Sequence, residues 1–303
     1  MTAQTSDTAR LKLLCIGEAM AELRRDTQGG FDVSFAGDCF NTAIYAARLF
    51  NAPKAVGFAS LIGHDPLSSG LFELATAEGL YTGCLERHQT KNIGVYAVAT
   101  DPQGERSFHY WRNQSAARHI GEDAGFLDRL PRAEIIYISA ITMAILGSAG
   151  RQTIIRFLQT RQKEGCLIAF DSNYRPSLWE SADMARDIIA EMWSLADIAL
   201  PSIDDEQAIW GETKEQVIAR FSQKNWHACA IKQAENGPHS FVLAQKVRYP
   251  RAAKVVDTTA AGDSFNAGYL HAVLMDLPEA ERLMAGHNLA AEVIGVRGAI
   301  MPR

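Results

Sequence analysis

Cysteines are few in this sequence and are not grouped. Five are scattered along the chain, and no two show the C-x-x-C spacing of a zinc or redox site. They are Cys15, Cys39, Cys84, Cys166 and Cys229. An odd number of ungrouped cysteines argues against a disulfide framework, so we expect free thiols in a reducing cytoplasm.

Long apolar segments are absent as well. Nowhere do 18 apolar residues follow one another, and residues 1–10 are polar, unlike the apolar region of a signal peptide. We therefore expect a cytoplasmic protein with no membrane partner. The length predicts one large domain at residues 11–303, preceded by a disordered tail at residues 1–10.

Blocks of basic residues are also missing. The formal net charge is −5, and no cluster of lysine and arginine offers the positive surface that binds a polyphosphate backbone. Nucleic acid is therefore not an expected partner. Hydrophobic residues make up 47% of the chain and charged residues 21%, a balance typical of a globular protein that buries a large core.

The sequence does contain a regular alternation of two patterns. Apolar runs that suit buried strands alternate with segments whose apolar residues recur at helical spacing. The runs lie at residues 13–17, 135–139, 167–170 and 198–200, and the helical segments at residues 39–50, 150–163 and 184–193. Strands that alternate with helices predict the α/β class, with a parallel sheet covered on both faces.

Two strand-like runs interrupt this rhythm. Residues 93–100 and 105–111 are joined by Asp-Pro-Gln-Gly, so they predict a β-hairpin. With residues 31–35 and 83–88, the hairpin forms either a small separate lid over the carboxyl ends of the main strands or an edge extension of the main sheet. The residues leave both open. We place the lid strands near 31–35, 83–88 and 93–112.

The segment D-T-T-A-A-G-D-S-F at residues 257–265 carries the strongest chemical signal. It leads from strand-like residues 254–256 into an apolar helix. At such a helix start, the free amides of Ala261, Gly262 and Asp263 would hold a phosphoryl group. The Asp263 carboxylate would accept the proton of an attacking hydroxyl, or it would merely cap the helix; the residue types favour neither.

This segment resembles the C-terminal signature of the PfkB carbohydrate kinases, usually D-T-T-G-A-G-D-x-F, with Ala260 in place of a Gly. Near the start, A-G-D-x-x-N at residues 36–41 resembles the family's G-G-x-x-x-N, whose Gly pair and Asn contact the sugar. The resemblance runs from about residue 13 to the end. It implies a three-layer α/β/α ribokinase-like fold with a small β-sheet lid, phosphorylation of a sugar by ATP with Mg²⁺, and a homo-oligomer.

The resemblance also implies roles for individual residues. Asp263 would be the catalytic base, with Gly262 and Ala261 holding the phosphoryl group. The positions that match the sugar-binding motif are Gly37, Asp38 and Asn41. The positions that match the nucleotide side are Lys232, Gly237, Thr258, Ala260 and Asn288. Whether a monovalent cation binds at residues 257–259 is left open.

The expected magnesium residues match less well. The family has N-x-x-E where this chain has Ser202-x-x-Asp205 followed by Glu206. Since Mg²⁺ keeps several waters, Asp205 or Glu206 would act on it through water. An acidic helix start that favours the helix dipole is an equal alternative.

Further segments resemble the 2-keto-3-deoxygluconate kinases within the family. These are G-E-A-M near residue 17, H-Y-W-R at residues 109–112 and D-S-N-Y-R-P-x-L-W at residues 171–179. A sugar acid carries a carboxylate that arginine binds through paired hydrogen bonds, so Arg112 and Arg175 are candidates, alternatively surface charges. Tyr96 and Tyr110 are candidates to contact sugar oxygens, alternatively packing residues. Fructose, another ketose or a related sugar acid is the alternative substrate, and a non-catalytic sugar or nucleotide sensor is the alternative function.

Overall fold

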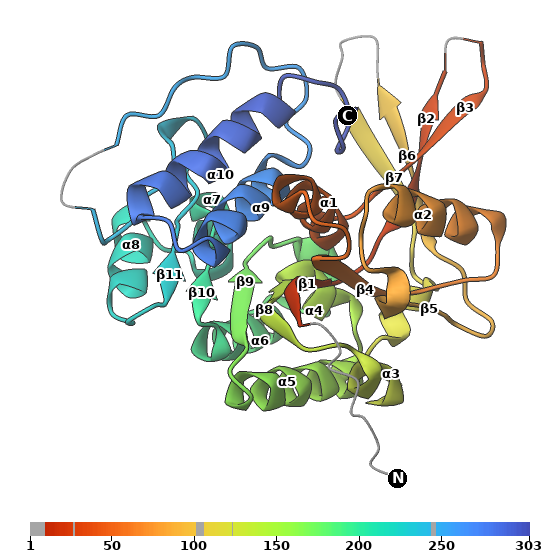
Figure 1. Ribbon diagram of the computed structural model, residues 1–303, viewed down its shortest axis with the longest axis horizontal. Coiled ribbons are helices and arrows are strands. Elements are labelled where there is room, and N and C mark those ends of the chain that lie inside the picture. Colours follow the sequence, from red (N-terminus) through yellow and green to blue (C-terminus); the bar gives the residue numbers. More distant parts are fainter. Residues whose placement is uncertain (1–9, 27, 101–105, 123, 244–246) are drawn as a thin grey trace.

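The computed structural model describes residues 10–26, 28–100, 106–122, 124–243 and 247–303 (Figure 1). Nearly all of the predicted tail at residues 1–10, and the predicted turn at residues 101–104, lie outside this part. Among the helices that the structure describes, none is both long enough and apolar enough to cross a lipid bilayer.

Within the described residues, seven parallel strands form the main sheet, in the order β11-β10-β9-β8-β1-β4-β5. The strands are β1 (Leu11–Ile16), β4 (Val56–Ile62), β5 (Leu85–Arg87), β8 (Ala133–Ser139), β9 (Leu167–Asp171), β10 (Ile198–Ala199) and β11 (Ala228–Cys229). Parallel strands end at the same edge of a sheet, so polar residues that follow β1, β8 and β9 come together there. The predicted α/β class is confirmed.

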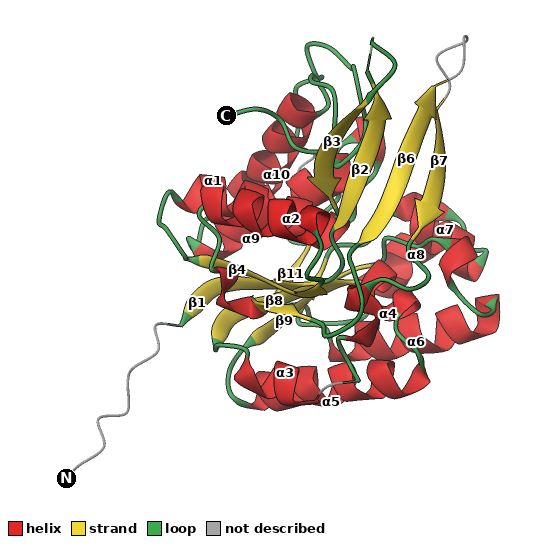
Figure 2. Cartoon of the chain, turned by 90° about the vertical axis from the view of Figure 1, so that its right-hand side faces the viewer, coloured by secondary structure: helices red, strands yellow, loops and turns green. Residues whose placement is uncertain are grey.

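Helices cover both faces of this sheet (Figure 2). In β1, Leu13 and Cys15 are buried toward one helical layer and Leu14 and Ile16 toward the other, which explains the unbroken apolar run. The first layer contains α1 (Asp38–Phe50), α2 (Pro66–Ala77), α9 (Ala261–Leu274) and α10 (Glu279–Val293). The second contains α3 (Ala124–Arg129), α4 (Ala140–Ile145), α5 (Ser148–Lys163), α6 (Ala182–Leu195), α7 (Ile203–Trp210) and α8 (Lys214–Ser222). Short 3₁₀ helices lie at η1 (Thr82–Cys84), η2 (Ala116–His119), η3 (Pro176–Leu178) and η4 (Ala234–Asn236).

A second sheet projects from the main sheet on the side of α1 and α2 (Figure 2). Its four strands, in the order β3-β2-β6-β7, are β2 (Met20–Arg25), β3 (Phe31–Ala36), β6 (Gly94–Thr100) and β7 (Arg106–Trp111). Its two faces differ. Tyr96 and Val98 are buried with Ala299 of the C-terminal segment, whereas Phe31 and Val33 are exposed on the opposite face. We call this sheet the lid.

Three details differ from the prediction. Residues 83–88 do not join the lid, because β5 pairs with β4 at the edge of the main sheet and buries Leu85 in its core. The lid strand β2 was not predicted, since its sequence M-A-E-L-R-R places charged residues where an apolar run would mark a strand. Residues 254–256 form no strand; Lys254 and Val255 are exposed, and the Val256 amide donates to the Ile294 carbonyl.

The C-terminal segment folds back over α1. The Tyr45 hydroxyl on α1 donates to the Ala299 carbonyl at 2.7 Å and accepts from the Met301 amide at 3.0 Å. The Gly298 amide donates to Oδ2 of Asp257 at 2.9 Å. Residues 298–301 therefore connect α1 to the loop that precedes α9.

Candidate active site

The starts of α1 and α9 meet at Asp263. Nδ2 of Asn41 donates to Oδ2 of Asp263 at 2.8 Å, and the Thr42 hydroxyl donates to the Asp263 carbonyl at 3.1 Å. Two residues predicted from motifs at opposite ends of the chain are thus in direct contact. Asp263 accepts no hydrogen bond from its own helix start that would make it a simple N-cap, since the cap residue of α9 is Ala260.

The Asp263 carboxyl has a raised pKa. Burial is the largest cause and the negative charge of Asp38 is the next, while the hydrogen bond from Asn41 opposes them. Together with Asp171 and Lys232, these influences raise the pKa from 3.8 to about 7. A carboxylate with a pKa near the working pH is well suited to general-base catalysis.

The helix start beside Asp263 presents two free amides rather than the predicted three. The Ala261 amide donates to the Thr258 carbonyl at 3.2 Å. Within the part of the chain that the structure describes, the amides of Gly262 and Asp263 have no acceptor. Among the described residues outside its own helix start, a methyl group added at Gly262 would meet Nζ of Lys232 alone, at 3.8 Å, so the side-chain position beside these amides is unobstructed. The arrangement can receive an anion.

Ala260 adopts a left-handed backbone, with φ of 62° and ψ of 15°. The observed φ explains why a Gly is usual at this position, because a side chain there is unfavourable by about 1 kcal/mol.

Gly37 and Asp38 begin α1 at the same edge. A Cβ at Gly37 would lie 2.1 Å from the Glu18 carbonyl, so only glycine allows the two backbones to approach. The Asp38 carboxylate accepts hydrogen bonds from the Ser139 hydroxyl and, at 2.8 Å, from Nδ2 of Asn173. Asp38 therefore lies at the site, with its carboxylate held in place by side chains at the end of β8 and just after β9.

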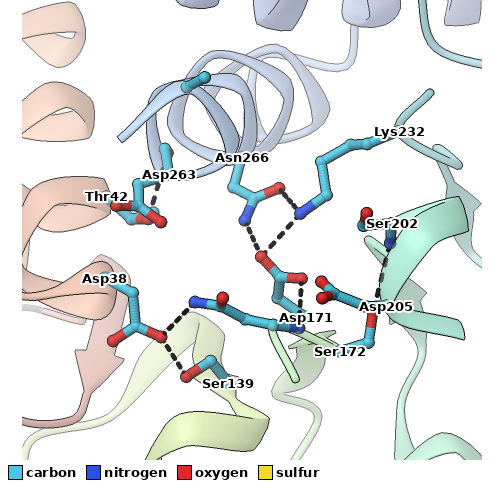
Figure 3. A network of polar contacts seen from close by, with 12 residues as sticks. Asp38, Thr42, Ser139, Asp171, Ser172, Ser202, Asp205, Lys232, Asp263 and Asn266 are labelled. Atoms are coloured by element: carbon cyan, nitrogen blue, oxygen red, sulfur yellow. Dashed lines mark hydrogen bonds and ion pairs between the residues drawn. The ribbon is translucent and has the colours of Figure 1, made fainter. Parts of the chain in front are cut away.

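A buried network beneath the start of α9 was not predicted as a unit (Figure 3). Nζ of Lys232 lies 2.7 Å from Oδ2 of Asp171 and 3.1 Å from Oδ1 of Asn266. Nδ2 of Asn266 donates to the same Asp171 oxygen at 2.6 Å and to the Tyr137 hydroxyl at 3.0 Å. The signal for Asp171 was a carboxylate at the end of an apolar strand, and for Asn266 a polar residue on the buried face of an apolar helix.

The two acidic residues predicted to act on magnesium diverge. Asp205 faces the network (Figure 3), and burial, followed by the charge of Asp171, raises its pKa to about 6. Glu206 was predicted wrongly. Its side chain points into the core, where it accepts hydrogen bonds from Nε1 of Trp193 and of Trp210 and pairs with Arg220 at 2.8 Å. Successive residues of a helix point about 100° apart, so Asp205 and Glu206 cannot share one face.

Arg175 lies on the side of Asp205. The two groups are 3.6 Å apart, and the Arg175 side chain is about half exposed, at 54%. Its guanidinium also donates to the Tyr174 carbonyl at 2.8 Å. An exposed ion pair of this length stabilises the fold little, so Arg175 keeps the freedom to turn toward a ligand.

The lid presents a polar surface on its inner face. Tyr96 on β6 lies directly opposite Tyr110 on β7, with ring centroids 5.6 Å apart. The Tyr96 hydroxyl donates to buried Glu22, which also binds Arg24 at 2.8 Å. Tyr110 is half exposed, at 52%. The two tyrosines therefore form one patch, with Tyr96 fixed and Tyr110 accessible.

Arg112, the residue that follows β7, is buried beside this patch. Its NH2 group pairs with Glu18, which also accepts from the Ser115 hydroxyl. The guanidinium lies 5.9 Å from the Tyr110 ring centroid. Among the described residues no acceptor is found for Nε of Arg112, although this atom is buried. An unsatisfied donor on a buried charged group is costly, and a bound anion would supply its partner.

The remaining predicted nucleotide residues are less closely grouped. Gly237 has a φ of 74°, and a Cβ there would lie 2.2 Å from the Tyr249 ring, so this turn requires glycine. Thr258 and Asn288 are exposed, on the loop before α9 and on α10. Their contacts to a nucleotide stay predictions. In the described ranges no three His, Cys, Asp or Glu side chains are grouped to hold a metal directly.

Comparison with known proteins agrees with this geometry. The family model described as "pfkB family carbohydrate kinase" matches residues 10–303. A protein of Dickeya dadantii named 2-dehydro-3-deoxygluconokinase is 37% identical over 95% of this chain and 96% of its own length. The Escherichia coli protein of the same name is 35% identical over 96% and 97%.

Solved structures show the same architecture. The crystal structure of a PfkB protein from a Polaromonas species superimposes with a TM-score of 0.81 and 26% identity, covering 94% of this chain and 96% of the other. The family match over nearly the whole length explains why both motifs and the lid occur together. The chain belongs to the pfkB family of carbohydrate kinases.

Proposed function

We propose that this kinase transfers the γ-phosphoryl group of ATP to the 6-hydroxyl of 2-keto-3-deoxygluconate, the sugar acid also called 2-dehydro-3-deoxygluconate. The observation that carries the substrate is Arg112, a buried arginine at the inner face of the lid whose Nε has no acceptor in the described chain. A carboxylate on the sugar would accept from it. The names of the relatives from Dickeya dadantii and Escherichia coli support the same substrate.

In this proposal the sugar binds between Gly37, Asp38 and Asn41 on one side and the lid on the other. Tyr110 and Tyr96 contact its hydroxyl groups, and Arg112 and Arg175 its carboxylate. Of these, Arg112 and the tyrosine pair lie together, whereas Arg175 would have to leave Asp205, from which it is 3.6 Å away. Closure of the lid would exclude water, which otherwise competes for the phosphoryl group.

The chemical step follows from the geometry at the start of α9. Asp263 accepts the proton of the 6-hydroxyl as its oxygen forms a bond to the γ-phosphorus of ATP. The bond from that phosphorus to the β–γ bridging oxygen breaks, and ADP leaves. The amides of Gly262 and Asp263 stabilise the negative charge on the phosphoryl oxygens during transfer.

Asp205 fits a role toward Mg²⁺, since it is a carboxylate beside the network and next to Asp171. It would hold water molecules bound to the ion. When bound, Mg²⁺ supplies positive charge to the phosphate oxygens. A monovalent cation would belong to the loop of Asp257, a buried carboxylate that accepts from the amides of Thr259 and Gly298.

The molecule also has features that support a cytoplasmic homo-oligomer. All five cysteines are buried and free, as suits a reducing compartment. The outer face of the lid exposes Phe31, Val33 and Trp111, and a second copy of the chain would cover this apolar surface.

A substrate comparison tests the proposed function. With ATP and Mg²⁺, we expect kcat/KM for 2-keto-3-deoxygluconate to exceed that for the neutral ketose fructose by about 100-fold or more, because the neutral sugar offers no carboxylate to Nε of Arg112. Arg112→Met should remove most of this preference, whereas Arg25→Met on the exposed end of β2 should keep it. Faster phosphorylation of fructose by the wild-type protein would refute the proposed substrate.

A further inference from the structure

The ammonium group of Lys232 has one unused hydrogen-bond donor. A lysine ammonium carries three N–H groups. Two of them have acceptors, Oδ2 of Asp171 at 2.7 Å and Oδ1 of Asn266 at 3.1 Å. In the part of the molecule that is described, no third acceptor lies within hydrogen-bond distance of Nζ. A ligand oxygen could therefore bind this group without displacing either partner.

The free donor borders the open space at the start of α9. Apart from the atoms of its own helix start, a Cβ built on Gly262 would have one neighbour within 4 Å among the described residues, Nζ of Lys232 at 3.8 Å. Figure 3 shows the lysine side chain reaching from the segment after β11 toward Asn266 and Asp171, below the helix that carries Asp263. A phosphoryl oxygen bound to the amides of Gly262 and Asp263 would lie within reach of the ammonium.

Asp171 and Asn266 are themselves fixed. Asp171 is 2% exposed and Asn266 is fully buried. Nδ2 of Asn266 donates to Asp171 and to the Tyr137 hydroxyl, which leaves Oδ1 as the atom that faces Lys232. An unrestrained lysine side chain is a flexible four-carbon stem, so its charge has no fixed position. Two rigid acceptors hold the ammonium group in one place.

The Lys232 ammonium lies in a region that contains several negative charges. The negative charges of Asp38 and Asp171 raise the pKa of Asp263, and the positive charge of Lys232 opposes them there and again at Asp205. Phosphoryl transfer brings further negative charge into this region. A fixed cation in a partly buried site stabilises such charge more strongly than one that must reorganise during the reaction.

We propose that Asp171 and Asn266 are positioning residues that hold the Lys232 ammonium at the start of α9, where its third N–H binds the phosphoryl group in transfer. Lys232 acts in concert with the two free amides, and the hydrogen bond strengthens as the phosphoryl oxygens gain charge. This inference rests on the proposed binding of the phosphoryl group at α9, and it does not depend on which sugar is the acceptor.

The first test removes the cation. With the sugar that the wild-type protein phosphorylates fastest, Lys232→Met should lower kcat about 100-fold to 1000-fold, as does loss of one transition-state donor, with KM for the sugar unchanged. The kcat–pH midpoint should also rise, because Asp263 loses a neighbouring positive charge while Asp38 and Asp171 remain. The control is Lys12→Met, which breaks a similar pair with Glu134 in β8, remote from α9. An unchanged kcat in Lys232→Met overturns the inference.

The second test separates positioning from general structure. Asn266→Ala keeps the ion pair of Lys232 with Asp171 and should lower kcat about 10-fold, again with little change in KM for the sugar. In a Lys232→Met background the same substitution should have almost no further effect on kcat, because it acts through the lysine. An equal factor in both backgrounds overturns the positioning role. If Lys232→Met does not fold, Asn266→Ala alone tests the inference. A fall in kcat with little change in KM supports it, and an unchanged kcat overturns it.

The failure of this inference is distinguishable from failure of the proposed function. If the wild-type protein prefers a neutral ketose, the proposed substrate is wrong, while the variants can still be measured with that ketose. If the wild-type protein phosphorylates the sugar acid and the Lys232 variant is fully active, only the role of Lys232 and its two positioning residues is wrong.

Discussion

Asn41 donates its side-chain amide to the Asp263 carboxylate across 2.8 Å, although 222 positions separate the two residues in the chain. The bond joins a residue of the first helix to the residue that we propose as the base. It holds one carboxylate oxygen in place and leaves the other for the proton of the sugar. It also stabilises the ionised form of the acid, which the charge of Asp38 opposes.

The first prediction concerns the pH dependence of kcat. Because the base must be ionised and its pKa is raised to about 7, kcat should rise with pH through about 7 and then level off. Asn41→Ala removes a bond to the ionised form, so the midpoint should move up. Asp38→Asn removes a negative neighbour, so the midpoint should move down. Shifts of both midpoints in the same direction would contradict this account.

The second prediction concerns stability. The folded-state pKa of Asp263, about 7, lies above its unfolded value of 3.8. Between these two pH values the folded protein keeps a proton on Asp263 that the unfolded chain has released. Ionised Asp263 therefore destabilises the fold above about pH 7, and this cost disappears toward pH 4. Asp263→Asn should abolish turnover and raise the free energy of unfolding at pH 8 by about 1–3 kcal/mol. Thermal unfolding at pH 8 and pH 5 measures the difference.

A matched control is Asp187→Asn, an exposed position on α6. It should change neither activity nor the pH dependence of unfolding. If Asp263→Asn kept its activity, the acid would not be the base, and if it stabilised the fold equally at both pH values, its charge would not be the cause.

The third prediction concerns the departure from the family signature. Ala260→Gly should stabilise the protein by about 1 kcal/mol at most, because the left-handed backbone at φ 62° no longer strains a side chain. The greater freedom of glycine in the unfolded chain offsets part of this gain. Ala219→Gly, exposed within α8, should instead destabilise by about 0.5–1 kcal/mol. Urea unfolding of both variants gives the comparison, and a loss of stability at position 260 would speak against the strain.

The fourth prediction separates the two acidic neighbours on α7. Asp205→Asn should raise the Mg²⁺ concentration needed for half-maximal activity, since it removes the carboxylate proposed to hold the metal's water. Glu206→Gln should leave that concentration unchanged and lower the melting temperature, because Arg220 loses a buried charged partner. Titration of activity with Mg²⁺, paired with thermal unfolding, distinguishes them. A metal effect from Glu206→Gln would reverse the assignment.

Much of the fold could be predicted from the sequence, because the local pattern of a segment agreed with its place in the folded chain. Buried parallel strands such as β1 and β8 are apolar throughout, and the signature around Asp263 combines small residues with a helix start. β2 escaped prediction for a physical reason: Glu22 and Arg24 lie on the inner face of the lid and neutralise each other there. A strand whose buried residues are charged has no periodic apolar pattern to detect.

The network around Lys232 could not be predicted, because its members come from separate elements. No sequence pattern within one of these elements indicates which residues of the others will contact it. Asp171 ends β9, Asn266 lies in α9 and Tyr137 belongs to β8. Glu206 failed for the converse reason. Its neighbour Asp205 has the same chemistry, and only the rotation of the helix decides which of the two faces the site and which meets the tryptophans.

The return of the C-terminal segment over α1 has a practical consequence for anyone who purifies this enzyme. Gly298 and Met301 engage Asp257 and Tyr45, so the polypeptide a few residues from Arg303 belongs to the support of the catalytic loop. A purification tag fused after Arg303 would begin close to that support, so specific activity should be compared before and after removal of such a tag.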